Sequence, residues 1–115
     1  MRHFLAGLAL AAALAGCLDP IRPKPPLNVT ISAAPLTVTV GQEVNFTINA
    51  QGNELLQVIA LFGDDAQETV ETGGATSARI NLTHAYTEAG VFTVTGRAID
   101  GVEGQRDATI QITVE

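Results

Sequence analysis

The sequence predicts an all-β domain, an immunoglobulin-like sandwich of two antiparallel sheets, and three observations support this fold class. Apolar and polar residues alternate in several short runs, which is the period of a half-buried strand. Gly, Asn and Asp fall between the runs, where reversals of the chain require them. No helical pattern of note follows the first sixteen residues. Short strands separated by turns at this spacing are typical of a sandwich.

Each run places apolar side chains on one face and polar ones on the other, and Thr is common on the polar face, as expected for strands. The inward residues, run by run, are Val29 and Ile31; Leu36, Val38 and Val40; Val44, Phe46 and Ile48; Ala78, Ile80 and Leu82; Phe92 and Val94; and Ala108, Ile110, Ile112 and Val114. Turns are expected at Gly41-Gln42, Gln51-Gly52-Asn53, Gly63-Asp64-Asp65, Gly73-Gly74, Glu88-Ala89-Gly90 and Asp100-Gly101.

The chain opens with a leader of the secretory type. The cationic start Met1-Arg2-His3 precedes an apolar run from Phe4 to Ala15, which is typical of a signal peptide. The run is too short to span a bilayer, because a spanning helix needs about 20 apolar residues. We therefore expect residues 1–16 to be a signal peptide that is cleaved between Gly16 and Cys17.

The leader ends in Leu14-Ala15-Gly16-Cys17, which resembles the lipobox of bacterial lipoproteins. The resemblance implies that the thiolate of Cys17 takes up a diacylglyceryl group and that the new amine receives a further acyl chain such as palmitate. Cys17 is the only cysteine, so lipidation would leave no free thiol in an oxidising compartment. The alternative is an ordinary signal peptide with a chance cysteine.

Several acyl chains give stable anchoring. We therefore expect a lipid bilayer as one partner, and a place in the bacterial cell envelope, at the outer membrane or the cell surface rather than the inner membrane.

Residues 17–26 read as a linker, because Pro20, Pro23, Pro25 and Pro26 favour an extended backbone there. Residues 27–115 leave room for one domain. The whole chain has a net charge of −6, and loss of Arg2 with the leader leaves five basic against twelve acidic residues, a net charge of −7. A nucleic-acid partner is not expected, since it would need a basic face.

Three blocks of sequence carry a more specific resemblance. Residues 40–46 read VGQEVNF, residues 62–65 read FGDD, and residues 83–94 read THAYTEAGVFTV. They are similar to the opening strands, the Phe-Gly-Asp-Gly turn and the His-x-Tyr-x-x-x-Gly-x-Tyr-x-Val signature of the PKD (polycystic-kidney-disease) domain. The resemblance covers roughly residues 34–115. It implies an immunoglobulin-like fold and contact with a protein or, less favoured, a polysaccharide.

The matching residues have structural roles that explain them. Gly63 and Gly90 suit positive φ at tight turns, and Asp64 suits a turn whose backbone N–H groups it can accept. Tyr86 is placed like the tyrosine of a tyrosine corner, whose hydroxyl pins a loop between two strands, and His84 is expected to pack or hydrogen-bond beside it. The expected structural motif comprises Phe62, Gly63, Asp64, His84, Tyr86 and Gly90.

The chain departs from the family pattern in its core. Ala60 stands where the family usually has Trp, Leu61 replaces an Asp, and Asp65 replaces the final Gly of the turn. Gly96 occupies an inward position where a large apolar residue is usual, and the chain contains no Trp. We expect a core that is either thinner or locally rearranged.

One strand breaks the alternation and supplies the candidate partner face. In the run from Leu55 to Phe62 the core positions are taken to be Leu56, Val58, Ala60 and Phe62. The remaining apolar residues, Leu55, Ile59 and Leu61, are then expected to point outward and to bind an envelope protein, with Val91 and Ile99 nearby. The alternatives are that another segment covers these residues or that a bulge reverses the register. A polysaccharide is less favoured, since sugars usually stack on exposed aromatic rings and few are expected here.

Catalysis is not expected. After the leader the chain has one His and two Ser, and Ser77 and His84 are an odd number of positions apart, so on a straight strand they face opposite sides. Acidic residues cluster near turns, but no spaced ligand loop for calcium occurs, and neither do zinc spacing or a phosphate loop. We therefore expect no metal and no cofactor. The expected function is interaction, with a structural spacer or an assembly subunit without its own ligand as the alternative.

Overall fold

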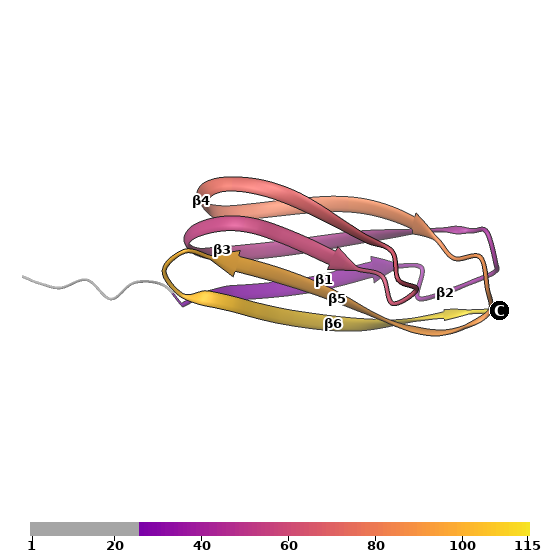
Figure 1. Cartoon of the computed structure of the whole chain (residues 1–115). Coiled ribbons are helices and arrows are strands. Elements are labelled where there is room, and N and C mark those ends of the chain that lie inside the picture. The colour runs from indigo at the N-terminus through magenta and orange to yellow at the C-terminus, as the bar shows by residue number, and fades with distance from the viewer. Residues whose placement is uncertain (1–25) are drawn as a thin grey trace, which may run out of the picture.

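The computed structural model describes residues 26–115. The expected signal peptide, the Gly16–Cys17 cleavage site, the lipidated Cys17 and almost all of the proline-rich linker lie outside these described residues. Within them no helix is long and apolar enough to cross a membrane. The strands are β1 (Asn28–Ala34), β2 (Thr37–Val38), β3 (Glu43–Leu61), β4 (Gln67–Ala85), β5 (Gly90–Asp100) and β6 (Gly104–Val114) (Figure 1).

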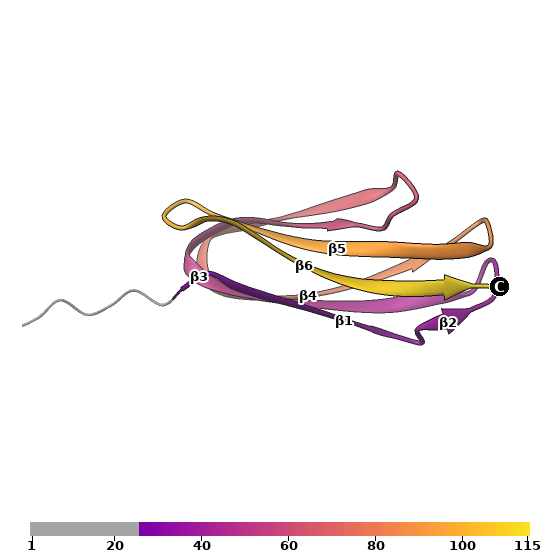
Figure 2. The same ribbon diagram turned by 90° about the horizontal axis from the view of Figure 1, so that it is seen from below.

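The strands form two layers because β3 and β4 each run through both of them (Figure 2). Residues 43–51 of β3 pair with residues 77–85 of β4 on one side, and residues 45–51 pair with β1 on the other. We call this layer sheet I. Residues 55–61 of β3 pair with residues 67–75 of β4 and with β5, and β5 continues to β6 and the short β2. This second layer is sheet II, and the predicted all-β sandwich is confirmed.

Two predicted turns are bends within continuous strands. β3 crosses from sheet I to sheet II near Gly52, where its register shifts between Gln51 and Leu55 and again between Leu55 and Gln57. β4 makes the same crossing at Gly73 and Gly74, both at positive φ. Because the two strands stay beside each other through the crossing, the chain bends without a loop.

The predicted run from Leu36 to Val40 is mostly not a strand. Only β2 remains of it, pairing in parallel with the end of β6. Val38 is buried, whereas Leu36 and Val40 are about half exposed. The alternation failed here because the segment lies at the edge of sheet II, where only one inward side chain reaches the core.

The core lies between the two sheets. Its packing shows how the volume missing at Ala60 and Gly96 is filled. Ala60 of β3 and Gly96 of β5 are direct neighbours across sheet II. A Cβ on Gly96 would lie 3.3 Å from the side chain of Ile48, which comes from sheet I and is fully buried. Ile48 therefore occupies the space that larger residues would fill, and the core is locally rearranged.

Candidate functional site

The turn between β3 and β4 lies at the end of the sandwich away from the start of β1 (Figure 1). Gly63 has φ +89°, and a Cβ there would lie 2.6 Å from the carbonyl oxygen of Thr93, so only glycine fits. Asp64 Oδ1 accepts a hydrogen bond from the N–H of Ala66 at 3.2 Å. Asp65 has φ 72° without being a glycine, an unusual conformation that Asp tolerates better than most residues.

A column of four rings supports this turn from beneath. Phe62 stacks on His84 with centroids 4.1 Å apart, and the edge of His84 meets Tyr86 at 4.7 Å. Tyr86 stacks in turn on Phe92 at 4.5 Å. The Tyr86 hydroxyl donates to the carbonyl oxygen of Phe62 at 2.8 Å, so the segment that follows β4 is tied to the turn after β3. These contacts are structural: every ring is buried or half-buried.

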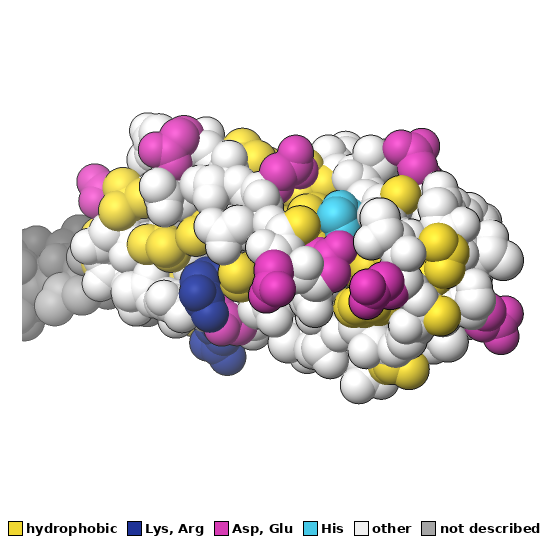
Figure 3. All heavy atoms as spheres, turned by 45° about the vertical axis from the view of Figure 1, so that its right-hand side comes forward, with side chains coloured by type: hydrophobic (Ala, Val, Ile, Leu, Met, Phe, Trp, Pro, Cys, Tyr) yellow, Lys and Arg dark blue, Asp and Glu magenta, His cyan; other side chains and the backbone are white. Residues whose placement is uncertain are grey.

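Asp64 and His84 form an ion-pair contact at this end, with 2.7 Å between Oδ2 and Nε2. Burial raises the pKa of Asp64, but the hydrogen bond and charge of His84 and the N–H of Ala66 outweigh it and leave the pKa below its usual value. Burial, followed by the charge of Asp64, raises the pKa of Tyr86 to about 12, so its hydroxyl stays a donor. Figure 3 shows acidic side chains spread around the histidine.

A second polar centre lies at the opposite end of the sandwich, around the carboxylate of Asp100. Its Oδ2 accepts the N–H groups of Asn53 and Glu54 at the bend of β3, each at 2.7 Å. Its Oδ1 accepts those of Val102 and Glu103 in the turn after β5, at 2.8 and 2.9 Å. Asp100 is only 3% exposed. Burial, the largest influence, raises its pKa, yet the four N–H donors together lower it to about 2.

The neighbouring glycine is explained by this carboxylate. A Cβ on Gly52 would collide with Asp100 and press on Leu27 and Leu55. Leu27 is buried, and Arg106 Nη1 donates to its carbonyl oxygen at 3.3 Å. The chain therefore enters the domain against the Asp100 centre.

The expected partner face is corrected at one position. Leu55 is fully buried and Leu56 is 42% exposed, the reverse of the prediction. The cause is the register shift between Leu55 and Gln57, which exchanges the two faces of the strand. Ile59 and Leu61 do lie on the outer side of sheet II, since Val58, Ala60 and Phe62 are buried.

On β5 the outer side carries Ile99, because Ala98 and Asp100 are buried. Ile59 pairs with Arg97, which lies two residues from Ile99 on the same face of β5. We call Ile59, Leu61 and Ile99 the outer strip. All three are half-buried, and Arg97 beside them is held by Asp107, with Nε to Oδ1 at 3.0 Å.

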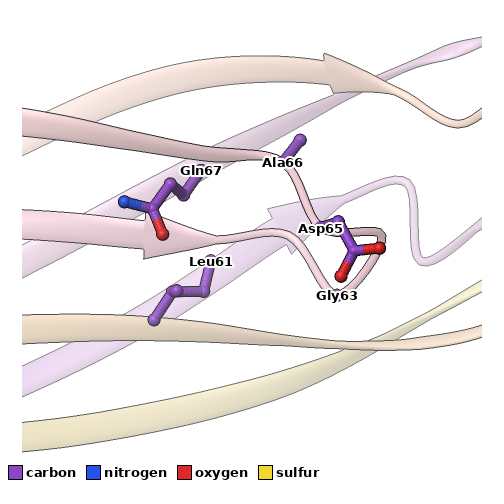
Figure 4. A pocket seen from close by; sticks show the side chains of 5 residues that line it. All are labelled: Leu61, Gly63, Asp65, Ala66 and Gln67. Atoms are coloured by element: carbon purple, nitrogen blue, oxygen red, sulfur yellow. The ribbon is translucent and has the colours of Figure 1, made fainter.

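The concave features of the described residues are shallow and open. One hollow of about 300 Å³ is lined by Leu61, Gly63, Asp65, Ala66 and Gln67 (Figure 4). There the side chains of Leu61 and Gln67 project from neighbouring strands, and the carboxylate of Asp65 lies at the tip of the turn. Other hollows of about 350 and 310 Å³ lie beside Gly52 and beside Glu88. Within residues 26–115 no three side chains of the His, Cys, Asp or Glu type converge to hold a metal ion.

Sequence reasoning missed two features that the structure shows. The Asp64–His84 pair joins two motif residues 20 positions apart, and no local pattern signals it. The turn expected at Asp100-Gly101 gives Asp100 no buried role, although it falls on the inward register of Val94 and Ala98. A carboxylate at an inward position next to glycine was the available signal, since such a group must find buried donors.

Comparison with known proteins agrees with this fold. The sequence model of the PKD domain family matches residues 28–114. The PKD domain of an M14-like peptidase from Thermoplasmatales archaeon SCGC AB-540-F20 is similar, with a TM-score of 0.68 and 18% identity over 80% of this chain and 98% of that one. No curated protein matches the sequence.

Two further structures share the fold. One is a CARDB domain from Pyrococcus furiosus, solved in complex with di-metal ions, with a TM-score of 0.60 and 17% identity over 83% of this chain and 97% of that one. The other is the PKD domain of the human VPS10 domain-containing receptor SorCS2, with a TM-score of 0.55 and 21% identity over 84% of this chain and 77% of that one.

Proposed function

Because the chain belongs to the PKD domain family, we propose that it is an envelope lipoprotein whose PKD domain binds another envelope protein through the outer strip. The observation that carries this is the position of Ile59, Leu61 and Ile99 on the outside of sheet II. Apolar residues gathered on a solvated sheet face favour a protein contact. The hollows among residues 26–115 are open to solvent, which suits contact with another protein surface.

The proposed anchor fits the way the chain enters the domain. Leu27 is docked at the Asp100 end, so the linker would leave there and the aromatic end would point away from the lipid. The outer strip lies along the flank of the sandwich, where a neighbouring envelope protein could reach it. The second candidate is a spacer without a ligand, which the mainly polar outer face of sheet I favours.

The anchor is tested by growth with a labelled fatty acid. We expect label to enter the full chain and the protein to sediment with membranes. The Cys17→Ala variant should carry no label and leave the membrane fraction, because it lacks the thiol that is acylated. Label that persists in this variant would overturn the lipoprotein assignment.

The partner face is tested with the lipidated full chain by crosslinking in intact cells followed by affinity capture. We expect a defined envelope protein with the wild type and at least a tenfold loss with Ile59, Leu61 and Ile99 all changed to Ser, because hot-spot residues dominate binding. The matched control changes Leu36 and Val40, exposed apolar residues elsewhere, to Ser and should retain the partner. Equal capture by both variants would refute the strip, and no capture by the wild type would favour the spacer.

A further inference from the structure

One flank of the sandwich is formed by β4 along its whole length (Figure 1). Among the described strands β4 pairs only with β3, in both sheets. Its other side is therefore a sheet edge with backbone donors and acceptors that no second strand takes up. Such an edge is a template for a further strand unless the sequence obstructs it.

The two arms of β4 are obstructed to different degrees. The arm in sheet II carries Glu68 and Glu71, and Glu68 lies on the core-facing side opposite Ala60. An inward charge on an edge strand is a common obstacle to pairing. The arm in sheet I, residues 77–85, has no carboxylate and no proline. The one permanently charged side chain of this arm is Arg79. The arm also carries His84, whose imidazole is hydrogen-bonded to Asp64.

The same arm carries apolar side chains that face the core but are only half-buried. On β3 the inward residues Phe46, Ile48 and Ala50 are buried almost completely. Their direct partners on β4 are Leu82, Ile80 and Ala78, and all three stay half-buried although they pack on the core. A further strand beside them would remove this apolar surface from water.

We propose that residues 77–83 of β4 pair antiparallel with residues 77–83 of a second copy of the chain, about a two-fold axis at Ile80. An axis at a residue keeps inward side chains beside inward ones. At Ile80 it sets Leu82 opposite the small Ala78 of the second copy, and Arg79 opposite Asn81 of the second copy. An axis at Arg79 would oppose two guanidinium groups. Sheet I then continues from one copy into the other, and the outer strip on sheet II stays free.

The register predicts that Ser77 faces Thr83 of the second copy, twice in each dimer. Both residues are exposed on the outer face of sheet I, so charges placed there should leave the fold intact. Ser77→Lys combined with Thr83→Lys sets like charges opposite each other, whereas Ser77→Lys combined with Thr83→Glu sets opposite charges there. Cross-strand charge pairs change pairing by modest amounts each, and the symmetry doubles them.

The experiment is sedimentation equilibrium of the full chain in density-matched detergent, with circular dichroism to show equal folding. We expect a wild-type dimer with Kd on the order of tens of micromolar, as for a small interface. The Lys/Lys variant should bind about tenfold more weakly and the Lys/Glu variant about fivefold more tightly. Hydrogen exchange at residues 77–83 should slow as the protein concentration rises.

Two results would overturn the proposal: a wild type that stays monomeric up to millimolar concentration, or equal association of the two double variants. A monomer would also result if the edge receives a strand from a different protein. Because these changes lie on sheet I, their failure is distinct from failure of the outer strip to bind a partner.

Discussion

Replacing Asp100 with alanine is expected to lower Tm by roughly 10–20 °C. The variant leaves four backbone N–H groups without their acceptor, at the bend of β3 and in the turn after β5. Buried donors that lose a charged acceptor are costly because water cannot replace it fully. Thermal unfolding followed by circular dichroism measures the change.

Asp107→Asn is the matched control, since Asp107 is an exposed carboxylate in the same hairpin and contacts only side chains. Its Tm should stay within about 3 °C of the wild type, because exposed ion pairs contribute little. Equal Tm values for Asp100→Ala and Asp107→Asn would show that the Asp100 carboxylate does not stabilise the bend of β3.

The stability of the domain should depend on pH in the acid range because of the Asp100 carboxylate. The pKa of Asp100 is about 2 in the folded chain against 3.8 ordinarily, so the unfolded state takes up the proton first as pH falls. Its stabilisation is complete well above the ordinary pKa and is lost between about pH 5 and about pH 2. The Tm of Asp100→Asn should fall less over this interval. Some acid dependence should remain, because the pKa of Asp64 is also lowered.

The strands could be predicted from the sequence because alternation reports directly which side chains face the core. The same rule failed at Leu55 and Leu56, since a shift of register exchanges the two faces without changing composition. The turn residues likewise predicted reversals of the chain at Gly52 and Gly73, where the strands only bend. Local pattern cannot tell a strand that bends between layers from two strands joined by a turn.

The motif at the turn could be placed from resemblance and from turn chemistry, and the structure adds the contacts. Tyr86 reaches the Phe62 carbonyl and Asp64 accepts the Ala66 N–H, both of which follow from residue type. The stacking of His84 on Phe62 and its bond to Asp64 depend on distant strands meeting. Such contacts need the topology, which a single sequence with alternation alone does not supply.

Ile48→Ala is expected to lower the free energy of unfolding by about 4 kcal/mol, near the upper end for such a change. The reason lies in the residues around it. Ile48 is fully buried and touches the space above Gly96, and Gly96 faces Ala60. The Ile48→Ala variant leaves a cavity beside Gly96 and Ala60. Because neither of these residues has a side chain long enough to fill it, the cavity stays open. Urea unfolding of the full chain measures the loss.

A second change at Gly96 tests the explanation rather than the magnitude. In the wild type a Cβ at Gly96 would meet three Ile48 carbons at 3.3–3.4 Å. This crowding offsets the stability that alanine gains over glycine within a strand because it loses less backbone entropy on folding. In the Ile48→Ala background that crowding is gone, and Gly96→Ala should restore about 1 kcal/mol. The two substitutions should therefore be strongly non-additive.

Val114→Ala is the matched control for this cycle. Val114 is buried but pairs with Gly90, far along β5 from Gly96, so its loss should add simply to that of Gly96→Ala. Additive behaviour of Ile48 and Gly96 as well would mean that the isoleucine does not fill the missing volume. Coupling confined to Ile48 would show that one side chain from sheet I compensates for the two small residues of sheet II.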